Sequence, residues 1–103
     1  MSVASGEQSS TPAVRSWTFL TNHAHVLLAI ARDPTARLRD VAETVGITER
    51  AAQAIVADLE AAGYLQRARV GRRNQYTVHR SGHFRHPAES DHSIGDLLDL
   101  FTR

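Results

Sequence analysis

The chain has 103 residues, which is enough for one domain with a single modest core. Its hydrophobic content of 42% is typical of a globular protein, and the absence of Cys excludes disulfides, thiolate zinc sites and Cys nucleophiles. No apolar run is long enough to span a bilayer, and residues 1–12 lack the basic start and apolar stretch of a signal peptide. These features favour a cytoplasmic protein.

The positive charge is concentrated in one part of the chain. Residues 63–86 contain six Arg and no acidic residue, although the net charge of the whole chain is only +1. Residues 17–62 carry −2 and residues 87–103 carry −3. All twelve basic residues are Arg, whose planar guanidinium fits phosphates and guanine edges better than an ammonium does. A GC-rich genome explains the abundance of Arg but does not explain its clustering.

The N-terminal third predicts a tail, a short strand and a helix. Residues 1–16 show no hydrophobic period and are expected to form a flexible tail. Residues 17–20 alternate aromatic and polar, as in a short edge strand. Asn22 is a suitable cap for the largely apolar run 23–32, which predicts a buried helix. Asp33-Pro34 should end that helix, because Pro disfavours helical geometry in the residue before it.

Two further helices follow, separated by a tight turn. The first covers Asp40–Val45, with Arg37-Leu38-Arg39 either extended or the entry to it, and Gly46 stops it. Thr48 is a helix N-cap for Glu49–Ala62. Apolar residues at helical spacing mark both helices, namely Leu38, Val41, Ala42 and Val45 in the first, and Ala52, Ile55, Val56 and Leu59 in the second. Two helices joined in this way form a helix-turn-helix.

A basic hairpin is expected directly after the second of these helices. The runs Tyr64–Val70 and Gln75–His79 are strand-like, and Gly71–Asn74 is predicted to be the loop between them. Residues 80–92 are polar and contain Gly and Pro, so they predict a loop. Ser93 is a candidate cap for a last helix over 93–103. Its apolar stripe of Ile94, Leu97, Leu98 and Phe101 packs either on the chain's own first helix or against another chain.

These elements resemble a known family. The residues that carry the likeness are Leu38-Arg39-Asp40-Val41-Ala42, Val45-Gly46-Ile47-Thr48-Glu49-Arg50, Leu59-Glu60 with Gly63-Tyr64-Leu65, and Gly71-Arg72-Arg73-Asn74-Gln75-Tyr76. Together they look like the small, single-domain MarR/ArsR-type winged helix-turn-helix transcription regulators of bacteria. The resemblance covers residues 17–79, and the helix over 93–103 more weakly. It implies a mainly α fold with a small β-sheet (α+β), a three-helix core, a two-stranded wing and a C-terminal helix.

The resemblance also implies sequence-specific binding of double-stranded DNA. The helix Glu49–Ala62 would enter the major groove, and the wing over residues 67–73 would contact phosphate or the minor groove. By geometry Arg50 suits guanine and Gln53 suits adenine. The expected DNA-binding residues are Arg37, Arg39, Thr48, Glu49, Arg50, Gln53, Arg67, Arg69, Arg72, Arg73 and Asn74, with Arg72 and Arg73 at the wing tip.

Plainer interpretations stand beside these roles. Thr48 is equally explained as a helix cap alone, and Arg50 as a solvated surface residue. Arg67 and Arg69 share one face of their strand, which either meets phosphate or is simply exposed. Asp58 and Glu60 oppose phosphate, but they lie in the C-terminal half of their helix and would form salt bridges with wing arginines.

Other function classes receive less support. His79, His83, His86 and His92 lie in an irregular segment without metal-ligand spacing, so we expect no metal and no cofactor. The chain has no Gly-rich phosphate loop and no Ser/His/Asp set, so we expect no enzyme. Winged helices also serve as protein–protein interaction modules, which is the alternative function. Relatives dimerise through terminal helices, which implies a homodimer on a palindromic site.

Overall fold

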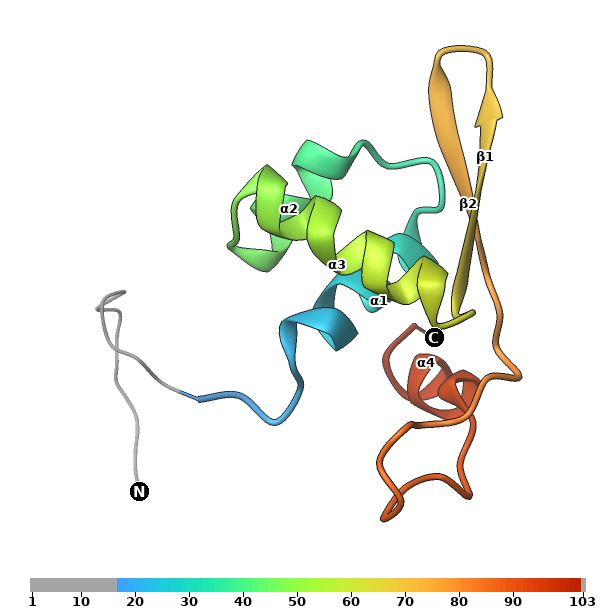
Figure 1. The fold of residues 1–103 in the computed structure, drawn as a ribbon. Coiled ribbons are helices and arrows are strands. Elements are labelled where there is room, and N and C mark those ends of the chain that lie inside the picture. Colours follow the sequence, from blue (N-terminus) through green and yellow to red (C-terminus); the bar gives the residue numbers. More distant parts are fainter. Residues whose placement is uncertain (1–16, 103) are drawn as a thin grey trace.

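The computed structural model describes residues 17–102, so the predicted tail over residues 1–16 lies outside the described part of the chain. Within it, four helices are joined by one antiparallel hairpin that stands at the side of the helices (Figure 1). The elements in chain order are α1 (Asn22–Arg32), α2 (Leu38–Val45), α3 (Glu49–Ala61), β1 (Leu65–Val70), β2 (Arg73–Val78) and α4 (Ile94–Thr102). The predicted mainly α fold with a small sheet is confirmed.

The core lies between the first three helices and the base of the hairpin. α1 contributes four buried side chains, those of Val26, Leu27, Leu28 and Ile30, as its apolar run predicts. On α3 the four apolar residues at helical spacing, Ala52, Ile55, Val56 and Leu59, are all buried. Removal of this apolar surface from water is the main favourable contribution to folding, and it fixes which face of α3 remains outside.

Local capping residues set most helix ends. α2 ends at Gly46, whose φ of 87° is left-handed, and α3 begins after Thr48, whose hydroxyl accepts from the Ala51 N–H at 3.0 Å. Both were predicted. The predicted cap of α1 was wrong by one residue, because Thr21 accepts from the Ala24 N–H at 3.3 Å and Asn22 is already helical.

The predicted edge strand over residues 17–20 is also wrong. This segment has no strand partner and bends, since the Thr18 hydroxyl donates to the Leu20 carbonyl at 2.6 Å. The Trp17 and Phe19 rings contact each other edge to face, with centroids 5.1 Å apart, and both stay exposed. An alternating pattern alone does not form a strand when no neighbour supplies hydrogen bonds.

The hairpin is tighter than predicted. Val70 pairs with Arg73, so the connection is only Gly71-Arg72, and Gly71 has the positive φ of 64° that a two-residue turn requires. The predicted loop Gly71–Asn74 is therefore corrected, because Arg73 and Asn74 belong to β2. The short turn matches the twist of the strands, and it leaves Arg72 at the tip.

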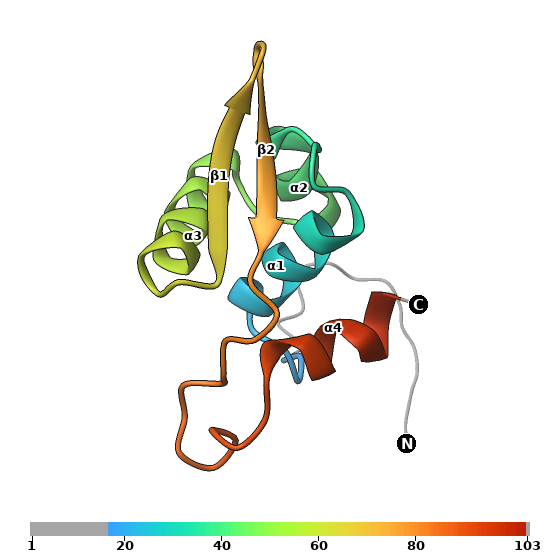
Figure 2. The same ribbon diagram turned by 90° about the vertical axis from the view of Figure 1, so that its right-hand side faces the viewer.

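The base of the hairpin is attached to the helices at two places. Tyr76 is buried in the core, and its N–H donates to the Pro34 carbonyl in the α1–α2 connection at 3.0 Å. On the other strand, Leu65 is buried, and the N–H of Tyr64 just before it donates to the Leu59 carbonyl of α3 at 3.0 Å. The hairpin therefore projects from the core as a wing beside the start of α2 (Figure 2).

The C-terminal helix packs on its own chain. Residues 80–92 carry no helix or strand and lead to α4, whose first turn is capped by the Ser93 hydroxyl accepting from the Asp96 N–H at 3.3 Å. Ile94 and Leu98 of α4 are buried against α1, and Phe101 accepts at its carbonyl from the Arg32 guanidinium at 2.9 Å. No helix among residues 17–102 is both long and apolar enough to cross a membrane.

The packing of α4 on α1 predicts how much stability is lost when a single side chain of α4 is shortened. Leu98→Ala should lower the free energy of unfolding by about 2–5 kcal/mol, because Leu98 is only 1% exposed and its loss leaves a cavity. Leu100→Ala, at a side chain 64% exposed, is the control and should change it by less than about 0.5 kcal/mol. Urea denaturation followed by circular dichroism measures both. Equal effects of the two substitutions would contradict the packing of α4 described above.

Candidate nucleic-acid interface

The first half of α3 presents an open polar face. The residues predicted to lie on it, namely Thr48, Glu49, Arg50 and Gln53, are all exposed. α4 packs on α1 and does not cover this face. The hydroxyl of Thr48 caps the helix, which accounts for its presence without any ligand. Among residues 17–102, Arg50 forms no ion pair, so its guanidinium is available to a partner.

A groove joins the wing to the start of α2. It has a volume of about 370 Å³ and lies between the α1–α2 connection and β2. Arg37, Arg72 and Arg73 line it together with Asn74, and none of its lining residues is acidic. Residues far apart in the sequence are thus placed around one space. The guanidinium groups around this space repel one another, and a bound anion would offset that repulsion. The groove is therefore electrostatically suited to an anion.

Arg73 has a structural contact that the sequence did not reveal. Its guanidinium donates to the Thr35 carbonyl at 2.5 Å, which ties β2 to the α1–α2 connection. Arg73 is the first residue of β2, directly after the turn, but its guanidinium is engaged by the α1–α2 connection. Within the described chain Arg72 has no hydrogen bond or ion pair, whereas Arg73 holds the wing in place.

The acidic residues of α3 have partners of their own. Glu60 pairs with Arg67 of β1 at 3.4 Å, in agreement with the predicted salt bridge to the wing. Asp58 instead accepts from the His23 ring at 2.8 Å, so the prediction of a wing partner is wrong for this residue. Arg69 donates to the Gly71 carbonyl at 3.4 Å. Both acids in the C-terminal half of α3 therefore have local partners, at the helix end away from Arg50.

Several predicted residues stay apart from the groove. Arg39 is exposed on α2, and Arg67 is directed to α3.

The pair of His23 with Asp58, which joins α1 to α3, was missed because no periodicity relates positions 35 residues apart. Across residues 17–102, no three His, Asp or Glu side chains lie close enough together to hold a metal ion.

Helices α1, α2 and α3 followed by an antiparallel hairpin define a winged helix-turn-helix protein. The sequence model of the MarR family matches residues 18–73, which is more than half of the chain. The chain therefore belongs to the MarR family, whose members are transcription regulators. The ArsR part of the resemblance stays a prediction.

Among solved structures, the chain resembles the PcaV transcriptional regulator from Streptomyces coelicolor, determined in complex with its natural ligand. The TM-score is 0.51 and the sequence identity is 27%. The match covers 58% of this chain but only 45% of PcaV, so less than half of that regulator has a counterpart here. A search of curated proteins found no match.

The contact of Arg73 with Thr35 predicts different effects for the two neighbouring arginines. Arg73→Ala should lower the free energy of unfolding by about 1 kcal/mol, because the hydrogen bond that ties β2 to the Thr35 carbonyl is lost. Arg72→Ala should change it by less than about 0.5 kcal/mol. Thermal unfolding of both variants at one protein concentration decides the matter. The assignment fails if Arg72→Ala is the more destabilising of the two.

Proposed function

We propose that this protein is a transcription regulator that binds double-stranded DNA with sequence specificity. The observation that carries the proposal is the groove of about 370 Å³, which is lined by Arg37 just before α2 and by two wing arginines, without any acidic lining residue. Phosphate is the anion that a duplex offers in regular array, and guanidinium groups pair with it in a bidentate way. Membership of the MarR family supports the same function.

In this proposal α3 lies in the major groove. Its open face offers Arg50 for a guanine edge and Gln53 for an adenine edge. Thr48 and Glu49, at the start of the helix, lie nearest to the backbone and the outer bases. The remaining contacts come from α2 and the wing, with phosphate or the minor groove bound by Arg37, Arg39, Arg67, Arg69, Arg72, Arg73 and Asn74.

The proposed active form is a homodimer in the cytoplasm, associated with the nucleoid when bound to DNA. Leu100 and Phe101 on α4 are 64% and 42% exposed, which leaves apolar surface for a second copy after α4 has packed on α1. A two-fold dimer places two α3 helices about 34 Å apart and reads a palindromic site. Selection from a random duplex library tests this geometry, and it should return two inverted half-sites.

Loss of a wing arginine should weaken binding to every sequence. Arg72→Ala removes one phosphate contact, so the affinity for selected and random duplexes should fall by a similar factor. The slope of log affinity against log salt should decrease by about one unit. Fluorescence anisotropy at several salt concentrations measures both quantities. If the wild-type chain binds no duplex even at low salt, the DNA proposal is wrong and a protein–protein interaction module is favoured.

Loss of a base-reading residue should instead relax specificity. Arg50→Ala should reduce discrimination at one base pair of the selected site by about 1–3 kcal/mol, because its bidentate contact to guanine is lost. Binding to random duplex should change much less than with Arg72→Ala. Repeating the library selection with this variant shows which position loses its preference. An unchanged preference at every position would mean that Arg50 does not contact a base.

A further inference from the structure

α3 carries three acidic residues, and two of them have partners in the C-terminal half of the helix. Glu60 pairs with Arg67 at 3.4 Å, and Asp58 accepts from the His23 ring at 2.8 Å. These pairs join α3 to β1 and to α1, so each acid has a structural role. The third acid, Glu49, lies in the first turn of the helix.

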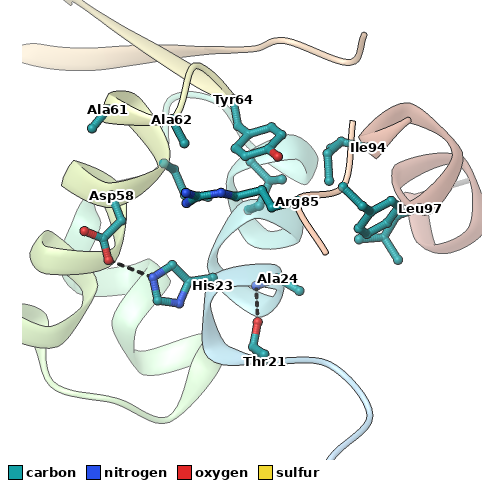
Figure 3. Close-up of a pocket in the computed structure, with 13 residues that line it drawn as sticks. Thr21, His23, Ala24, Asp58, Ala61, Ala62, Tyr64, Arg85, Ile94 and Leu97 are labelled. Carbon is teal, nitrogen blue, oxygen red and sulfur yellow. Dashed lines mark hydrogen bonds and ion pairs between the residues drawn. The ribbon is translucent and has the colours of Figure 1, made fainter. Parts of the chain in front are cut away.

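The surroundings of Asp58 are separate from the proposed DNA-binding face. Asp58 and His23 lie at the edge of a cavity of about 630 Å³, which is bounded by the start of α1, the end of α3, residues 80–92 and the start of α4 (Figure 3). Arg85 lines the same cavity, whose walls are otherwise mainly apolar. Because a helix rises about 1.5 Å per residue, Asp58 lies about 12 Å along the axis from Arg50.

Glu49 has no partner of this kind. Its side chain is exposed, and it forms no hydrogen bond or ion pair with any residue among 17–102. It does not serve the N-cap, because the Thr48 hydroxyl accepts from the Ala51 N–H, and the acid of a capping box would stand at position 51. The helix dipole favours an acid anywhere in the first turn, so it does not explain why this one lies on the open face.

On a duplex, a carboxylate at this place is unfavourable unless a base donates a hydrogen bond to it. The carboxylate repels phosphate, and it loses water when the groove covers it. In the major groove, cytosine presents its N4 amino group as a donor, whereas guanine and thymine present acceptors. Adenine places the acceptor N7 beside its amino group. Cytosine is therefore the base that suits a carboxylate.

We propose that Glu49 selects cytosine at one position of the DNA site, and that it does so by excluding the other bases. This inference rests on the proposed function. With cytosine, the carboxylate accepts a hydrogen bond from the N4 amino group. With any other base it stays unpaired near the phosphates. Glu49 thus lowers the affinity for unrelated sequences, whereas Arg50 raises the affinity for the selected one.

Glu49→Gln tests this role, because it keeps the size of the side chain, removes its charge and adds an amide that suits adenine. In the wild-type chain, replacing the selected cytosine should lower the affinity about tenfold. Library selection with the variant should change the preferred base at that position from cytosine to adenine. The affinity for random duplex, measured by fluorescence anisotropy, should rise about threefold, because one negative charge near the phosphates is removed. Circular dichroism checks that the variant is folded.

Glu89→Gln is the matched control, because it removes the same charge in the segment 80–92, at the other end of the molecule from the wing tip (Figure 1). It should change neither the preferred bases nor the affinity for random duplex.

An unchanged preference at every position with Glu49→Gln would overturn the proposal, even if binding to random duplex rose, because Glu49 would then only repel phosphate. So would equal effects of the two substitutions on random duplex. Either result leaves DNA binding by the chain intact. If the wild-type chain binds no duplex, the proposed function is wrong and the role of Glu49 is wrong with it.

Discussion

The attachment of the hairpin to the α1–α2 connection is the constraint on which the proposed DNA-binding surface depends. The N–H of buried Tyr76 donates to the Pro34 carbonyl at 3.0 Å, and the guanidinium of Arg73 donates to the next carbonyl, that of Thr35, at 2.5 Å. Because these two carbonyls belong to the connection that leads into α2, the two hydrogen bonds hold the wing beside the start of that helix. The groove lined by Arg37 and Arg72 lies at this attachment, because Thr35, Arg73 and Tyr76 line it as well.

The distribution of charge explains how a chain with a net charge of only +1 can present a basic surface. Glu60 is paired with Arg67 and Asp58 with His23, both in the C-terminal half of α3. The acids near the C-terminus are engaged around α4, where Asp99 pairs with Arg80. Arg37 and Arg72 have no such partner within the described residues. The field near a surface follows this local arrangement and not the sum over the chain.

α3 links the proposed DNA-binding face to the cavity at the other end of the molecule. Its first residues form the open polar face, whereas Asp58, Leu59, Ala61 and Ala62 at its end line the cavity. The start of α1, Tyr64, residues 80–92 and the start of α4 supply the rest of the cavity wall, and only the last two lie beyond the MarR match. In Figure 1 the tip of the wing and the 80–92 segment stand at opposite ends of the molecule. The family domain therefore contributes to both surfaces, whereas the C-terminal segment contributes only to the cavity.

The sequence alone was sufficient wherever a structural feature depends on residues within one helical turn or one strand. Helical spacing predicted the buried residues of α3 and hence its open face, while Gly46, Thr48 and Ser93 marked helix ends through contacts three or four residues away. Only the tertiary structure decided features that need a distant partner. Residues 17–20 form no strand because no neighbour pairs with them, and Arg73 is a tether because the Thr35 carbonyl, 38 positions away, lies beside it. The cavity beside Arg85 likewise needs four separate segments, and no local pattern encodes their meeting.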